Sequence, residues 1–164
     1  MSPVKGKACT SFSLILKEVI MKISIASDHA GYAYKCRIIE HLRAKNIKVQ
    51  DHCTDSENPV DYPDFIRPAS EAVAQDESDV GIVLGGSGNG EAMAANKVRH
   101  IRCAVCWNVE SAKLAKAHNN ANMISIGQRM VSLETALAMV DAWLETSFEG
   151  GRHIPRINKI EPSF

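Results

Sequence analysis

The segment DVGIVLGGSGNGE, residues 79–91, joins a continuous apolar run to a glycine-rich turn. The apolar run (79–85) predicts a buried strand, and a helical pattern begins near Glu91. Glycines allow a ligand to approach the backbone closely, and successive N–H groups in such a turn, with a helix N-terminus behind it, form a concave anion site. The turn lacks the Gly-Lys-Ser/Thr of a phosphate-binding P-loop, and Glu91 replaces the last glycine of a dinucleotide fingerprint. A tight structural turn would use the same glycines, so the loop alone leaves both interpretations open.

Glu91 gives this turn a more specific chemistry. A carboxylate is unhelpful where a turn only holds phosphate. It is useful where the turn stabilises a transient oxyanion while the carboxylate moves a proton bound to carbon, as in enolisation beside a carbonyl. The helix dipole would lower the pKa of Glu91 and burial would raise it. An ordinary acidic residue in a first helical turn would leave the same trace in the sequence.

On both sides of this segment, short β-rich runs alternate with helical patterns, about five times in all. The predicted strands are 22–27, 47–52, 79–85, 101–106 and 122–127, and the predicted helices are 31–46, 64–77, a helix from about 91, 109–118 and 131–146. Helix 31–46 carries the stripe Tyr34, Ile38 and Leu42, and helix 131–146 carries Leu133, Leu137, Val140 and Leu144. The alternation predicts an α/β, three-layer Rossmann-like fold with a five-stranded parallel sheet and helices on both faces.

Three regions are expected along the chain. Residues 1–20 form an N-terminal extension, either a short helix or disordered. They are not expected to be a signal sequence, because the apolar stretch SFSLIL is too short and no cleavage site is clear. Residues 21–148 form the domain that contains the glycine-rich turn and Glu91, and residues 149–164 form a C-terminal arm whose two arginines could contribute to a phosphate site. No apolar run is long enough for a transmembrane helix.

Composition narrows the range of partners. Nineteen basic and nineteen acidic residues balance, so bulk charge gives no reason to expect nucleic acid or an anionic membrane as a partner. Five cysteines, an odd number, indicate reduced thiols and a cytoplasmic location. Cys103 and Cys106 form a C-x-x-C within a predicted strand, which would point them to opposite faces. Structural thiols are therefore favoured over a zinc or redox site.

Ligands of such sheets bind beyond the carboxyl ends of the strands. Asp28 and His29 follow the first strand, and Arg129 follows the fifth. His118 and Asn119 end the fourth helix, and Arg152 and Arg156 lie four residues apart in the arm. Three arginines could clamp a phosphate through charge-assisted hydrogen bonds, although each alone is more typical of a solvated surface.

Six motifs occur in order: SDHAGY (27–32), DYPD (61–64), GGSGNGE-x-x-AANKV (85–98), HNNAN (118–122), IGQRM (126–130) and GGRH-x-x-R (150–156). Together they closely resemble the type B ribose-5-phosphate isomerases, in the wider group that holds the galactose-6-phosphate isomerase subunits. The resemblance covers about residues 21–160. It implies an aldose–ketose isomerase of the pentose phosphate pathway that interconverts ribose 5-phosphate and ribulose 5-phosphate through a cis-enediolate, without metal or cofactor. It also implies a homodimer or a dimer of dimers, with active sites shared between subunits.

The resemblance also assigns roles by position. Glu91 is the base that shuttles the proton between C2 and C1, and His118 opens the furanose ring. Asp28 assists ring opening and contacts hydroxyls, and Asn119 lies beside the developing charge. The enediolate oxygens are held by Ser87, Gly86, Gly88 and Gly90, and the phosphate clamp consists of His29, Arg129, Arg152 and Arg156.

The sequence departs from the family pattern at one position, and it leaves open two alternatives to ribose 5-phosphate isomerisation. Many family members carry a cysteine base at the position held here by Gly85, so this chain matches the subgroup that uses the glutamate after the loop. The substrate could instead be galactose 6-phosphate, allose 6-phosphate or a tetrulose phosphate. A phosphate-binding module without catalysis would keep the glycines and arginines, but it would have no need of Glu91 or His118.

Overall fold

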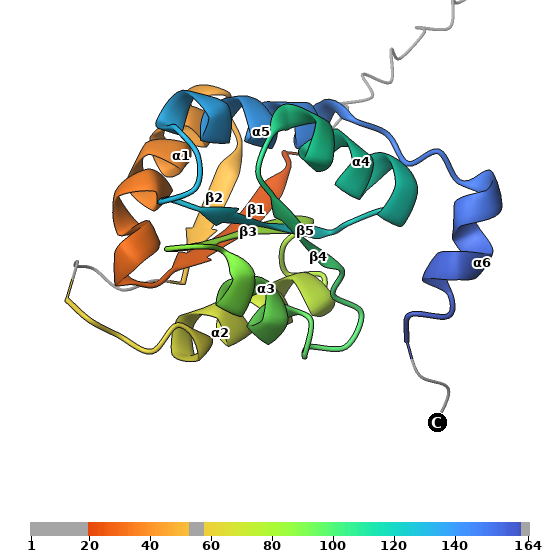
Figure 1. Ribbon diagram of the computed structural model, residues 1–164, viewed down its shortest axis with the longest axis horizontal. Helices are drawn as coiled ribbons and strands as arrows, with labels where there is room; N and C mark the ends of the chain where they lie inside the picture. The colour runs from red at the N-terminus through yellow and green to blue at the C-terminus, as the bar shows by residue number, and fades with distance from the viewer. Residues whose placement is uncertain (1–19, 53–57, 162–164) are drawn as a thin grey trace, which may run out of the picture.

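The computed structural model describes residues 20–52 and 58–161, which form a five-stranded sheet between two helical layers (Figure 1). The strands are β1 (Lys22–Ser27), β2 (Lys48–Asp51), β3 (Val80–Gly85), β4 (Cys103–Cys106) and β5 (Met123–Gly127). They lie in the order β2-β1-β3-β5-β4, and every neighbouring pair is parallel. The predicted three-layer α/β fold is therefore confirmed. Most of the predicted extension, together with Cys9 and Cys53, lies outside the described residues.

The helices divide between the two faces of the sheet (Figure 1). One face is covered by α1 (Tyr32–Ala44), α4 (Val109–Asn119) and α5 (Leu133–Glu145), and the other by α2 (Pro63–Ala74) and α3 (Asn89–Ala95). The short helix η1 (His29–Gly31) leads into α1, and η2 (Gly151–His153) leads into α6 (Ile154–Ile157), which lies beside the layers. Within the described ranges, no helix has the length and apolar character needed to cross a membrane.

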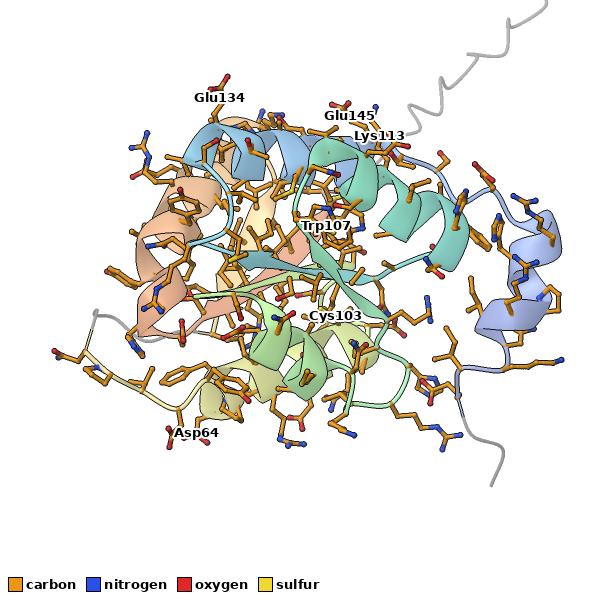
Figure 2. The ribbon with its side chains drawn as sticks, in the orientation of Figure 1. Asp64, Cys103, Trp107, Lys113, Glu134 and Glu145 are labelled. Atoms are coloured by element: carbon orange, nitrogen blue, oxygen red, sulfur yellow. The ribbon has the colours of Figure 1, made fainter. Side chains whose placement is uncertain are left out.

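Side chains alternate across the sheet and form two cores. In β3, Ile82 and Leu84 belong to the core under α1 and α5, whereas Val83 belongs to the core under α2. Cys106 lies in the first core and Cys103 in the second, which confirms that the C-x-x-C cysteines point to opposite faces. Charged side chains on the outer helices, such as Lys113, point away from the sheet (Figure 2).

The buried face of α5 differs from the predicted stripe. Ala136, Met139, Val140 and Trp143 are buried, whereas the leucines of the stripe are only partly buried. Trp143 is 1% exposed, and its indole Nε1 donates a hydrogen bond to the Ala121 carbonyl at 3.3 Å. The indole is the largest apolar group on the helix and needs a partner for its N–H, so its burial sets the rotation of α5. For α1 the predicted stripe is confirmed, with Ile38 and Leu42 fully buried.

The sheet order places a switch point between β1 and β3. The chain leaves β1 for β2 on one side and then returns to β3 on the other. Crevices at such points, beyond the carboxyl ends of the strands, are where ligands bind in open α/β sheets. This arrangement brings Asp28, after β1, next to the loop that follows β3, and the backbone N–H of Asp28 donates to the Leu84 carbonyl at 3.2 Å.

Candidate active site

The glycine-rich loop is held against β5 by its own backbone. Gly88 has a φ of 82°, and its carbonyl accepts a 2.6 Å hydrogen bond from the buried Ser125 Oγ. A Cβ on Gly88 would lie 3.1 Å from the Gly127 backbone nitrogen, so only glycine suits both the backbone conformation and the space. The Arg129 N–H donates to the Gly86 carbonyl at 3.0 Å. These contacts fix the loop, so that it presents a preformed surface to a ligand.

Glu91 lies in the first turn of α3 and is 4% exposed. Burial, with the charge of nearby Asp28, raises the pKa of the Glu91 carboxyl, although backbone N–H groups of Glu91 and Gly88 donate to it and oppose the shift. Of the two opposing effects left open by the sequence, burial prevails. The result is a carboxylate that is a stronger base than an exposed glutamate.

The Glu91 carboxyl occupies the space directly beside Gly85. A Cβ built on Gly85 would lie 1.9 Å from Glu91 Oε1 and 2.2 Å from Cδ. No side chain at residue 85 fits while the carboxyl stays in place. Glycine at this position and glutamate at 91 are therefore two parts of one arrangement.

A cleft of about 400 Å³ opens above the loop. It is lined by Asp28, His29, Ala30, Tyr62, Gly86, Ser87, Gly90, Glu91, Arg129 and Met130. Most of the residues predicted to act near the reacting carbons thus lie together in one chain. The Arg129 guanidinium lies over Gly86, where a Cβ would come within 3.2 Å of Nη1.

Asp28 and its neighbours form the wall opposite the loop. Asp28 Oδ1 accepts a 3.0 Å hydrogen bond from the Gly31 N–H and caps η1. A Cβ on Gly31 would lie 2.6 Å from the Leu84 carbonyl carbon, which shows how closely η1 packs on β3. His29 Nδ1 accepts a long 3.4 Å hydrogen bond from the Val60 N–H. Asp28 is therefore held rigidly, and both side chains line the cleft.

His118, Asn119, Arg152 and Arg156 lie away from this cleft. Helix α4 starts at the carboxyl end of β4 and runs back for 11 residues, about 16 Å at the helical rise, to Asn119. There the Ala121 N–H donates to the Ala115 carbonyl, and the chain enters the amino end of β5. His118 thus lies near the opposite end of the sheet from Glu91. The arm that carries Arg152 and Arg156 lies at the same end, because His153 stacks on His118 and Glu161 accepts from the His100 N–H just before β4. One chain does not bring the predicted catalytic set together, nor the three-arginine clamp.

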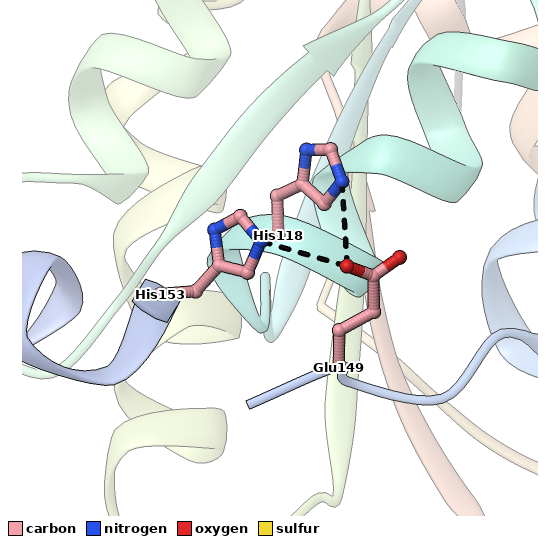
Figure 3. A group of neighbouring side chains, drawn as sticks. All are labelled: His118, Glu149 and His153. Atoms are coloured by element: carbon pink, nitrogen blue, oxygen red, sulfur yellow. Dashed lines mark ion pairs between the residues drawn. The ribbon is translucent and has the colours of Figure 1, made fainter. Parts of the chain in front are cut away.

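His118 instead contacts two residues of the arm (Figure 3). Its ring stacks on that of His153, with centroids 4.5 Å apart and an interplanar angle of 12°. Glu149 Oε2 lies 3.7 Å from His118 Nε2 and 3.5 Å from His153 Nε2. The end of α4 and the start of the arm are joined through these three side chains.

Comparison with known proteins agrees with this geometry. The family model described as Ribose/Galactose Isomerase matches residues 23–160. The chain belongs to the ribose/galactose isomerase family, whose members act on sugar phosphates. It is 47% identical over 141 residues to the ribose-5-phosphate isomerase B of Mycobacterium leprae, covering 84% of this chain and 86% of that one. It is 43% identical over 139 residues to a putative sugar phosphate isomerase of Rickettsia bellii, covering 85% of this chain and 96% of that one.

A solved member of the ribose/galactose isomerase family adds a ligand. The ribose-5-phosphate isomerase B of Mycoplasma genitalium, solved with bound ribulose 5-phosphate, superimposes with a TM-score of 0.82 at 39% identity. The match covers 85% of this chain and 93% of that one. The resemblance stated from the sequence motifs is thus confirmed at the level of the family.

Three residues of this family member had no role in the sequence prediction. Tyr62 lines the cleft, and its ring leaves no room for a Cβ on Gly90, which would lie 2.8 Å from Cζ. Tyr62 stands in the DYPD motif, so the motif was a usable signal. His153 and Glu149 stand in or next to the GGRH motif, but only the fold shows that they meet His118.

Proposed function

We propose that this protein interconverts ribose 5-phosphate and ribulose 5-phosphate by proton transfer through a cis-enediolate. The observation that carries the proposal is the buried Glu91 carboxylate, fixed beside a preformed glycine-rich loop in the cleft. A phosphate-binding module would gain nothing from this carboxylate, because its charge would repel the ligand. A site that removes a proton from carbon, in contrast, needs such a carboxylate as its base.

The proposed chemistry divides between the carboxylate and the loop. Glu91 removes the proton from C2 of the open-chain aldose and returns it to C1, while the proton of the C2 hydroxyl passes to the C1 oxygen, which leaves the ketose. Its raised pKa brings its basicity closer to that needed near neutral pH. Ser87 and the loop N–H groups stabilise the negative charge that develops on the enediolate oxygens. Asp28 binds substrate hydroxyls on the opposite wall.

The remaining steps require groups from a second subunit. Ring opening by His118, charge stabilisation by Asn119 and phosphate binding by Arg152 and Arg156 would all occur beside Glu91. In one chain these residues lie near the other end of the sheet. A two-fold dimer in which the α4 end of one subunit meets the cleft of the other would complete two equivalent sites. His29 and Arg129 would then bind the phosphate from the cleft side.

The first test measures ribulose 5-phosphate formation in the presence of a chelator. We expect full activity of the wild-type protein, and a fall of at least about 10²-fold in Glu91→Gln, since general base catalysis contributes on that scale. Glu110→Gln is the matched control, because Glu110 is an exposed acidic residue in the first turn of α4. Turnover of Glu91→Gln close to that of Glu110→Gln would exclude Glu91 as the base.

The second test asks whether sites are shared. His118→Asn and Glu91→Gln chains are purified separately and then mixed under conditions of confirmed subunit exchange. Each heterodimer has one site with neither defect, so about a quarter of the wild-type activity should return for an equal mixture of a dimeric enzyme. Exchange without any return of activity would show that the two residues act in the same chain or not at all.

The third test addresses the sugar. The family model names both ribose and galactose isomerases, and the relatives include proteins described only as sugar phosphate isomerases. Ribose 5-phosphate, allose 6-phosphate, galactose 6-phosphate and a tetrulose phosphate are compared by kcat/KM on the same preparation. We expect the highest value for ribose 5-phosphate. A higher value for any of the other three would replace the pentose in this proposal.

A further inference from the structure

Two histidines and a glutamate converge where α4 meets the arm. One ligand atom each from His118, Glu149 and His153 can be chosen so that all three lie within 4.8 Å of one another (Figure 3). Within residues 20–52 and 58–161, this is the one group of three such side chains with that geometry. It mixes two imidazole nitrogens with one carboxylate oxygen, the donor set of many zinc sites with an open fourth position.

The spacing is close to that of a tetrahedral metal site. Metal–ligand distances of about 2.0–2.1 Å place neighbouring ligand atoms roughly 3.4 Å apart. Glu149 Oε2 is 3.5 Å from His153 Nε2 and 3.7 Å from His118 Nε2. The two rings are stacked, so the His118 ring must tilt toward the buried His153 ring for both nitrogens to face one ion. The side chains of His118 and Glu149 are 34% and 57% exposed, which leaves them free to make that movement.

The site has one rigid member and a fixed backbone. His153 is 6% exposed, and its backbone N–H donates to the Gly150 carbonyl at 3.1 Å. The Glu149 N–H donates to the Ala117 carbonyl at 3.0 Å, which ties the arm to the last turn of α4 next to His118. The three ligands are therefore brought together by the fold before any ion binds, and less conformational entropy is lost on binding.

We propose that His118, Glu149 and His153 form a binding site for a transition-metal ion of the Zn²⁺ class, and that the bound ion inhibits isomerisation. Imidazole nitrogens favour Zn²⁺, Cu²⁺, Ni²⁺ and Co²⁺ over Mg²⁺ and Ca²⁺. The ion occupies Nε2 of His118, so this nitrogen can no longer exchange a proton with the sugar. The inhibition rests on the proposed function, in which His118 opens the furanose ring, whereas the binding does not.

Arg152 competes with the ion for one of the ligands. Its Nε lies 3.5 Å from His153 Nε2, so the guanidinium faces the lone pair that the ion needs. The guanidinium also adds a positive charge close to the site. Removing this side chain should therefore tighten metal binding, whereas a merely disruptive substitution would weaken it.

The test uses the full chain, freed of metal by a chelator and titrated with Co²⁺ and Zn²⁺ by calorimetry and absorption spectroscopy. We expect one ion per chain and a Co²⁺ spectrum without a sulfur-to-cobalt charge-transfer band, because the ligands are nitrogen and oxygen. Glu149→Gln and His153→Asn should each weaken Co²⁺ binding by at least about 10-fold. Arg152→Ala should strengthen it.

His100→Asn is the matched control. His100 is exposed and has a φ of 70°, a conformation that asparagine tolerates well. The Co²⁺ affinity of His100→Asn should equal that of the wild-type protein. Because Glu149 is largely exposed, Glu149→Gln tests the site even if His153→Asn does not fold.

Two results would overturn the proposal. One is an affinity that is unchanged in Glu149→Gln, and the other is a spectrum with a thiolate charge-transfer band. Inhibition is tested separately, as the ratio of ribose 5-phosphate turnover with and without Zn²⁺. If Co²⁺ binds as expected but Zn²⁺ leaves turnover of an active enzyme unchanged, the inhibitory half of the proposal is wrong. If no sugar phosphate is turned over at all, the proposed function fails, while the binding result stands.

Discussion

Placing a single methyl group at Gly85 should move the proposed catalytic base. In Gly85→Ala the new Cβ would start 1.9 Å from Glu91 Oε1. Real Cβ atoms essentially never have a non-bonded neighbour closer than 3.0 Å, so the carboxyl must retreat by about 1 Å or more. A displacement of about 1 Å in a catalytic group can lower the rate by roughly 10²-fold, about 2.7 kcal/mol in transition-state free energy. We expect a loss of kcat on that scale.

The fold should tolerate the same substitution. The atoms that must move are the end of a flexible side chain, not backbone, and Gly85 does not have a positive φ. Stability by urea unfolding should therefore stay within about 1 kcal/mol of wild type. Gly81→Ala is the matched control on the same strand, because its Cβ meets only side chains of the core, mainly Met123. It tests β3 without touching the cleft, and its kcat should be preserved.

The outcome that would refute this reasoning is a Gly85→Ala enzyme with wild-type kcat, alongside an inactive Glu91→Gln enzyme. The carboxyl would then act from a place other than the one seen beside Gly85. A constructive test follows from the same contact. Gly85→Cys alone should be as damaged as Gly85→Ala, and adding Glu91→Ala should restore some activity, because the thiol then has room to act as base.

Three further predictions concern titration, thiols and phosphate. Because the folded-state pKa of Glu91 is raised, the acid limb of kcat/KM against pH should lie above the usual carboxyl range. For the same reason, the free energy of unfolding of Glu91→Gln at neutral pH should be higher than that of the wild-type protein. That stability gap should close as pH falls below about 4.3, where the unfolded glutamate is protonated too, as thermal unfolding across pH will show. Burial raises the pKa of the Cys106 thiol to about 12 and raises that of Cys103 as well, so iodoacetamide at neutral pH should leave both unmodified in the native protein, as judged by mass spectrometry. Arg152→Ala should raise KM for the sugar phosphate by at least about 10-fold while far-ultraviolet circular dichroism stays unchanged, because a charge-assisted hydrogen bond is lost; an unchanged KM would remove this arginine from the phosphate site.

Local sequence patterns predicted the strands well, because each is a short apolar run bounded by turn residues. They predicted the face of α5 less well. Its leucines look like the core stripe, but the indole N–H of Trp143 must reach the Ala121 carbonyl, and that contact depends on a distant segment. The pairing of Glu91 with Gly85 was also beyond the local pattern. The sequence shows only that residue 85 is glycine and not the cysteine found in many family members. The structure shows that the Glu91 carboxyl fills the space that a side chain at residue 85 would take.

The residues predicted for one site lie in two groups within a single chain. Strand ends can be placed from the alternation alone, since all parallel strands open on the same edge. His118 was listed with them because it ends the helix after the fourth strand, yet the end of that helix lies at the opposite edge, just before β5. The resemblance implies shared sites. The direction of α4, which carries His118 away from Glu91 within one chain, supports that proposal. The contacts of His118 with Glu149 and His153 join segments about 30 residues apart, which no local pattern encodes.

The burial of Trp143 gives the protein a natural optical reporter. The chain has two tryptophans, and the other, Trp107, follows β4 and is 61% exposed (Figure 2). The two indoles should differ in fluorescence: Trp143 should emit toward the blue and resist a dissolved quencher, while Trp107 should emit toward the red and be quenched readily. A loss of the blue component then signals melting of the core between α5 and the sheet. Protection of the red component at higher protein concentration signals that another molecule has covered the carboxyl edge of β4.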